Sequence, residues 1–162
     1  EWVDGPDIRI VSPQGLYTIT PCRVLDTRNP NGAFGGPALS SFGVRAIDVV
    51  GRCGVPADAV AIAANHTVLS GPSAGSISVF PGNETGTRTE SVSFKPQRAR
   101  ALGSIDTLAT DGSGSLKVRN NTDTPIHYIL DVTGYFRLQA DEAQGVLDDR
   151  AGVGRGPGFA DS

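Results

Sequence analysis

Residues 71–75 read Gly-Pro-Ser-Ala-Gly and fit the Gly-x-Ser-x-Gly pattern in which hydrolases place a nucleophilic serine, here Ser73. That nucleophile needs a sharp turn from a strand into a helix, whereas a strand-like segment at 76–80 follows this serine. His66 and His127 are the only imidazole bases, and each falls within a strand pattern, as a satisfied or solvent-facing histidine would. We therefore interpret 71–75 as a hairpin loop, and predict no catalytic residue and no enzymatic activity.

A second cluster pairs an acid with a guanidinium at Asp26 and Arg28, two residues apart and so on one face of a strand. Such a pair can bind a sugar hydroxyl or a carboxylate. Alternatively it is structural: Asp26 accepts backbone N–H groups of the turn at 29–32, and Arg28 crosses to a neighbouring strand such as the one with Asp131. We favour the structural interpretation. The other aspartates lack the spacing of a calcium loop, so we predict no metal and no cofactor.

The chain has two cysteines, Cys22 and Cys53. No Cys-x-x-Cys pair and no neighbouring histidine suggests zinc or redox chemistry, so a structural disulfide is favoured, with two buried free thiols in a cytosolic protein as the alternative. A disulfide implies an oxidising compartment, and we expect a secreted protein that is extracellular or at the cell surface. The start at Glu1, without Met or an apolar leader, is typical of a mature product after leader removal.

Composition restricts the class of protein. The 162 residues suffice for one hydrophobic core, and 21 Gly with 11 Pro exceed what long helices tolerate. The net charge is -3, and Lys95 and Lys117 are the only lysines among 14 basic residues, so we predict no nucleic-acid partner. No apolar run approaches the roughly 20 residues of a membrane span, so we predict none.

The apolar residues alternate with polar ones, which predicts strands near residues 44–50, 76–80, 92–94, 116–118 and 126–132. Residues 59–69 have a composition that also suits a helix. Pro56 and Pro72 bracket them, and we interpret them as a strand buried on both faces, with a helix as the alternative. The predicted fold is all-β: an antiparallel β-sandwich, jelly-roll or Ig-like, of about eight to ten strands with one disulfide.

Acidic residues gather at both ends of the chain, which predicts three parts. Residues 1–15 form an N-terminal arm that can add an edge strand, 16–136 the sandwich, and 137–162 a glycine-rich acidic tail. The candidate assembly contacts in the arm are Trp2, Val3, Ile8, Ile10 and Val11.

Three separated segments carry a resemblance. Residues 16–28 contain Pro-Cys-Arg-Val-Leu-Asp-Thr-Arg, 50–60 contain Gly-Arg-Cys-Gly-Val-Pro, and 130–136 end in Asp-Val-Thr-Gly-Tyr-Phe. In this order they resemble a family of secreted bacterial β-sandwich modules marked by these motifs. The resemblance covers residues 16–136. It implies a disulfide between Cys22 and Cys53 and an extracellular location, and it carries over no enzymatic activity.

Two function classes follow. The first is a structural or adhesive module that binds copies of itself or other cell-surface proteins through its arm or tail, as a subunit of a cell-surface or extracellular filament. The alternative is a carbohydrate-binding module that binds glycans. Sugar sites usually stack rings on exposed aromatics, and only 6% of the residues are aromatic. Tyr17, Phe34 and Phe42 are the candidates for a small platform near residues 32–37.

Overall fold

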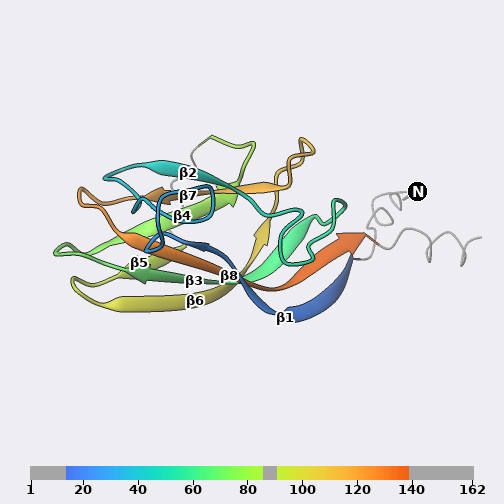
Figure 1. Ribbon diagram of the computed structural model, residues 1–162, viewed down its shortest axis with the longest axis horizontal. Coiled ribbons are helices and arrows are strands. Elements are labelled where there is room, and N and C mark those ends of the chain that lie inside the picture. The colour runs from blue at the N-terminus through green and yellow to red at the C-terminus, as the bar shows by residue number, and fades with distance from the viewer. Residues whose placement is uncertain (1–13, 86–90, 139–162) are drawn as a thin grey trace, which may run out of the picture. The chain divides into compact units, whose positions relative to one another are not determined.

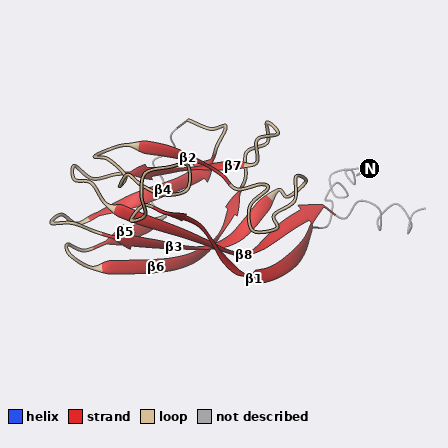
Figure 2. Ribbon diagram, in the orientation of Figure 1, coloured by secondary structure: helices blue, strands red, loops and turns tan. Residues whose placement is uncertain are grey.

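The computed structural model of this chain describes residues 14–85 and 91–138. These residues form eight strands (Figure 1) and no helix, and so none that could cross a membrane (Figure 2). The strands are β1 (Gln14–Asp26), β2 (Val44–Asp48), β3 (Ala61–Leu69), β4 (Gly75–Pro81), β5 (Val92–Phe94), β6 (Ala99–Thr107), β7 (Ser115–Asn120) and β8 (His127–Leu138).

The strands make two four-stranded antiparallel sheets packed together, in the orders β1-β8-β3-β6 and β2-β7-β4-β5. The chain passes between the sheets at almost every connection. Of the described strands, only β4 and β5 are both consecutive and paired, through Gly75–Phe94 and Ile77–Val92. Each sheet is therefore completed by segments that lie far apart in the sequence.

Each sheet has two central strands, β8 and β3 in the first and β7 and β4 in the second. In the first sheet, β3 pairs along its whole length with β6 and with β8, with one irregularity between Ala63 and Ala64. In the second, β7 pairs with β2 and β4. These registers fix which residues point inward, because side chains alternate between the faces of a strand.

Inward-pointing residues of both sheets form one core within the compact unit Leu16–Arg137. Its fully buried members include Leu25, Ile47, Ile62, Ile77, Leu108, Leu116, Tyr128 and Leu130. Burying such side chains contributes roughly 1.5–3 kcal/mol each, which is the main force that holds the two sheets together.

The predicted fold class is confirmed, as is its disulfide. Residues 61–69 form strand β3, so the helical alternative is wrong. The expectation that both faces of this strand are buried is also wrong, because residues at 63, 65, 67 and 69 are only half-buried. The face away from the core carries mostly small side chains, and no layer of the sandwich covers it.

The alternation of apolar residues did not indicate β6, whose Ala, Gly and Ser residues are mostly exposed. The interpretation of residues 71–75 as a hairpin loop is wrong, since they connect β3 of one sheet to β4 of the other.

The predicted arm and tail fall mostly on residues that the structure does not describe. Residues 14 and 15 begin β1, and residues 137 and 138 end β8. The proposed assembly contacts Trp2, Val3, Ile8, Ile10 and Val11 all lie outside the described residues.

The core can be tested with two isoleucines on neighbouring strands. Ile62 on β3 is 0% exposed and Ile105 on β6 is 66% exposed. We expect Ile62→Ala to lower the free energy of unfolding by about 2–5 kcal/mol, because it leaves a cavity, and Ile105→Ala to change it by less than about 0.5 kcal/mol. Urea denaturation measures both, and equal losses would contradict the assigned faces of the sheet.

Candidate functional site

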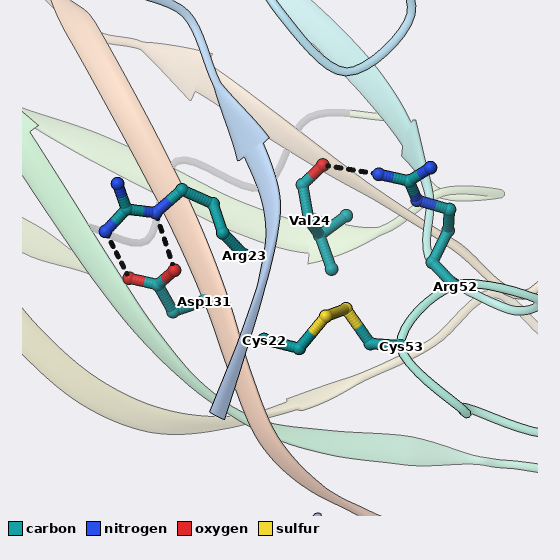
Figure 3. Close-up of a disulfide and its surroundings, with 6 residues drawn as sticks. All are labelled: Cys22, Arg23, Val24, Arg52, Cys53 and Asp131. Carbon is teal, nitrogen blue, oxygen red and sulfur yellow. Dashed lines mark hydrogen bonds and ion pairs between the residues drawn. A yellow bond between two sulfur atoms is a disulfide. The ribbon is translucent and has the colours of Figure 1, made fainter. Parts of the chain in front are cut away.

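The sequence motifs meet around strand β1, where a disulfide joins Cys22 to Cys53 (Figure 3). Their Cα atoms are 5.8 Å apart, within the usual span of a disulfide. Cys53 lies on the connection between β2 and β3, at a backbone φ of 54°, next to Gly54 at 81°. The bond thus ties an edge strand of one sheet to the chain segment that arrives from the other.

On the other side of β1, Arg23 binds Asp131 on the neighbouring strand β8 (Figure 3). Its Nε donates to Oδ1 at 2.9 Å and its Nη2 donates to Oδ2 at 3.3 Å. This two-pronged geometry is the strong form of a guanidinium–carboxylate contact. The prediction that Arg28 makes the cross-strand contact is therefore wrong, since Arg23 occupies that role.

Asp26 is the last residue of β1, and its carboxylate accepts hydrogen bonds from two arginines. Arg28 reaches it through its backbone N at 3.0 Å, its Nε at 2.9 Å and its Nη2 at 2.8 Å. Arg23 adds a fourth bond from Nη1 at 3.3 Å. These bonds, the Arg28 side chain's foremost, hold the pKa of Asp26 well below its usual range, although burial opposes them. A carboxylate that is 6% exposed and engaged in this way fixes the turn after β1.

The contacts around β1 form one unit, the β1 clasp. Its members are Cys22, Arg23, Asp26, Arg28, Cys53 and Asp131.

Arg52, next to the disulfide, covers the ring of Phe34 in the loop between β1 and β2. Its Cζ lies 3.5 Å from the centroid of Phe34, and its Nη2 donates to the carbonyl of Val24 at 3.4 Å (Figure 3). Its Nε is buried and has no hydrogen-bond partner among the described residues. Arg52 therefore stabilises the clasp mainly by cation–π packing.

His127 and Thr27 extend this region toward the start of β8. The Thr27 hydroxyl accepts the backbone N–H of Tyr128 at 2.8 Å, and its oxygen lies 3.0 Å from Nδ1 of His127. The Thr27 hydroxyl thus contacts both Tyr128 and His127, so the His127 ring has a hydrogen-bond partner within the fold.

A second polar network lies inside the first sheet. Nδ1 of His66 is 2.6 Å from the hydroxyl of Tyr128, and its Nε2 is 2.7 Å from Oδ2 of Asp106. Burial, together with the charges of Asp106 and Asp131, raises the pKa of Tyr128 well above its usual value, so its hydroxyl stays protonated. His66 thus bridges the Tyr128 hydroxyl and the Asp106 carboxylate through its two ring nitrogens.

The sequence interpretation treated His66 alone and missed its partners. The Ser104 hydroxyl lies 3.0–3.1 Å from both oxygens of Asp106 and completes the chain of contacts. The available signal was a polar residue at an inward strand position, between Ala64 and Val68, because such a group must find hydrogen-bond partners.

Ser73 does not meet either histidine network. Its hydroxyl donates to Asp123 at 3.4 Å in an exposed loop, and strand β4 follows it where a nucleophile elbow would have a helix. Among residues 14–85 and 91–138, no three His, Cys, Asp or Glu side chains are grouped to hold a metal ion.

The three rings considered for a sugar platform lie apart. Phe34 sits at the Asp26 end of β1, where its carbonyl accepts the backbone N–H of Asp26. Tyr17 lies on β1 nine residues before Asp26, which corresponds to about 30 Å along an extended strand. Its ring stacks on Tyr135, with 5.3 Å between the ring centroids. Phe42 follows a separate loop and is 53% exposed.

Comparison with known proteins leaves the resemblance as an expectation. No protein-family model matches the chain, and no curated protein is significantly similar to it.

The disulfide of the clasp gives a direct stability test. Closing a loop with a sequence separation of 31 stabilises the fold by roughly 3–4 kcal/mol through the unfolded chain. We expect the double variant Cys22→Ser/Cys53→Ser to lose about 2–5 kcal/mol in urea denaturation. The wild type measured with reductant is the control, and it should match the variant; an unchanged stability in both would contradict this role of the bond.

Asp26 predicts a specific pH dependence. Because its pKa is lower in the folded protein than in the unfolded chain, the carboxylate stabilises the fold above the unfolded value of about 3.9 and loses this effect as the pH falls. We expect the stability difference between wild type and Asp26→Asn to be constant above about pH 5 and to shrink below about pH 4. Denaturation at pH 7, 5, 4, 3 and 2 measures it.

Asp48→Asn, which removes a carboxylate from an exposed position on β2, gives the baseline for a lost surface charge. A stability difference for Asp26→Asn that stays the same down to pH 2 would rule out the ionised carboxylate as its source.

Proposed function

We propose that this protein is a non-enzymatic structural or adhesive module that works outside the cell. It associates with copies of itself, or with other cell-surface proteins, as a subunit of an extracellular assembly or filament.

The observation that carries this proposal is that the polar groups of the β1 clasp bind one another within the chain. The Asp26 carboxylate, the best candidate from the sequence for a ligand group, accepts four hydrogen bonds from arginines of its own chain. His66 likewise has both ring nitrogens in contact with side chains of neighbouring strands, Tyr128 and Asp106. These groups hold strands together, which supports a role in mechanical integrity over one in ligand chemistry.

The disulfide supports the location. A bond that stabilises the fold by several kcal/mol persists in an oxidising compartment and is rare in the cytosol. This agrees with the resemblance to secreted bacterial modules, and we propose that the protein is secreted.

The carbohydrate-binding alternative has weaker support. A sugar platform needs exposed ring faces, yet Arg52 covers Phe34 and Tyr135 stacks on Tyr17, with Arg137 5.5 Å from the Tyr17 centroid. We therefore keep the structural role as the proposed function.

The proposed assembly through the arm or tail can be tested by deletion. The arm's Ile8, Ile10 and Val11 have the composition of an added strand, so we expect deletion of residues 1–13 to leave a folded β-protein that forms smaller assemblies. Sedimentation velocity and negative-stain electron microscopy measure the assemblies, and circular dichroism measures the fold. Deletion of residues 139–162 is the parallel test of the tail.

Two substitutions sharpen the arm test. Ile8→Ser/Ile10→Ser removes the apolar contacts and should reproduce the deletion, whereas Asp4→Ser/Asp7→Ser removes charge alone and should assemble like the wild type. If both deletions leave assembly intact, or if the full chain is monomeric at every concentration, assembly through these ends is wrong.

A further inference from the structure

Strand β6 is a long sheet edge that no described strand pairs with on its outer side. It runs for nine residues, Ala99–Thr107, and pairs with β3 on one side only. Figure 1 shows it as the outermost strand of its sheet. All nine residues are exposed or half-buried, including Leu102 at 41% and Ile105 at 66%. Its outer N–H and C=O groups have no protein partner in the described part of the chain.

The other three sheet edges are shortened or tied down. β1 is tied to the preceding connection of β3 by the disulfide and by Arg52, which donates to the Val24 carbonyl. On β2, Arg45 donates to carbonyls of the loop at 32–37. β5 has three residues. Natural proteins shorten or cover sheet edges because a free edge pairs with another chain, and among the described residues β6 is neither short nor covered. It does carry the charged residues Arg100 and Asp106, which a pairing partner has to neutralise.

We infer that two copies of this protein pair through β6, edge to edge and antiparallel, with Gly103 of one copy opposite Gly103 of the other. This inference rests on the proposed function, since it supplies one contact for assembly. It differs from the arm in using only residues within the folded sandwich.

The sequence of β6 is self-complementary in this register. With Gly103 opposite Gly103, each residue before position 103 faces the residue equally far after it in the second copy. Arg100 therefore lies opposite Asp106 of the second copy, and Asp106 lies opposite the second copy's Arg100. Ala101 lies opposite the exposed Ile105 of the second copy, so a small side chain meets a large one. Opposite charges at directly facing positions stabilise a sheet.

The pleat places these partners on the same faces. Arg100, Leu102, Ser104 and Asp106 pair with Val68, His66, Ala64 and Ile62 of β3, which all point to the inner face. Directly opposed residues in an antiparallel pair share a face, so Arg100 and the second copy's Asp106 do so as well.

The charged pair is chemically available. Arg100 is exposed and has no ion pair among the described residues. The Asp106 side chain is 12% exposed and accepts from His66 and Ser104, and a carboxylate has about four acceptor positions. The His66 network thus holds Asp106 in place while leaving capacity for a guanidinium from outside.

The paired sheet would be continuous across the two copies, with eight strands from two four-stranded sheets. Such a contact is isologous and closes with two copies, so a longer filament needs a second contact, for which the proposed arm remains available.

Cysteine cross-linking tests the register. Both native cysteines are in the disulfide, so an introduced one is the only free thiol. Gly103→Cys is sterically allowed, because the nearest atom to an added Cβ is the Ala64 carbonyl oxygen at 3.8 Å. Symmetry places the two introduced thiols opposite each other, so we expect covalent dimers on mild oxidation, seen by non-reducing electrophoresis of the full chain.

Ala101→Cys is the matched control. Ala101 lies on the same strand and the same face as Gly103. In this register, residue 101 of one copy faces residue 105 of the other, so the two residues at 101 are offset by four positions, about 13 Å along the strand. A disulfide needs Cα atoms within about 7 Å. We expect at least tenfold less dimer. Equal cross-linking of the two variants, or none at Gly103→Cys, would overturn the pairing.

A charge reversal gives an independent measurement. Arg100→Glu places a glutamate opposite Asp106 of the second copy in each of the two symmetric pairs. We expect the dissociation constant of the dimer, measured by sedimentation equilibrium, to rise about tenfold or more. Arg98→Glu makes the same charge change just outside the paired residues and should have a smaller effect. Equal effects of both variants would count against the register.

The outcomes also separate this inference from the proposed function. Larger assemblies that need the arm, without selective cross-linking at residue 103, would overturn the β6 pairing and leave assembly through the arm standing. Selective cross-linking that persists in chains that form no larger assembly would establish the pairing and overturn assembly through the arm or tail.

Discussion

The disulfide between Cys22 and Cys53 is the constraint on which the first sheet depends. Strand β1 has thirteen residues and lies at a sheet edge, so β8 alone would otherwise hold it. The covalent bond fixes β1 to the connection that enters β3, while Arg23 fixes it to β8 from the other side. Val24 and Val55, which flank this junction, can then both be buried in the core.

The connectivity explains why such ties are needed. Nearly every connection passes between the sheets, so neighbouring strands are joined by few local turns, and pairing is mostly long-range. Long-range pairing carries a large loop-closure cost, which a cross-link within the early part of the chain reduces. The contact from Arg23 to Asp131 spans 108 positions and adds specificity where the last strand joins the first.

Buried polar groups provide a second kind of specificity. His66 on β3 binds Tyr128 on β8 and Asp106 on β6, so one imidazole joins three strands of the sheet. A shift in register would leave buried donors and acceptors unpaired, at roughly 1–3 kcal/mol each. The same network orients Asp106 on the exposed edge strand, which links the interior of the sheet to the surface that we propose for self-association.

The sequence alone predicted the all-β class, the strands near residues 44–50, 92–94 and 126–132, and a disulfide between the two cysteines, which the structure confirms. Alternation of apolar residues and the number of cysteines are properties that can be read from the sequence without knowledge of the packing. The sequence did not reveal β6, because most of the residues at 99–107 are exposed and none of them belongs to the hydrophobic core. The tertiary structure alone decided which strands are neighbours, and that Arg23 rather than Arg28 reaches Asp131. The reason is physical: the partner of a side chain depends on segments more than a hundred residues away, and only packing of the two sheets brings those segments together.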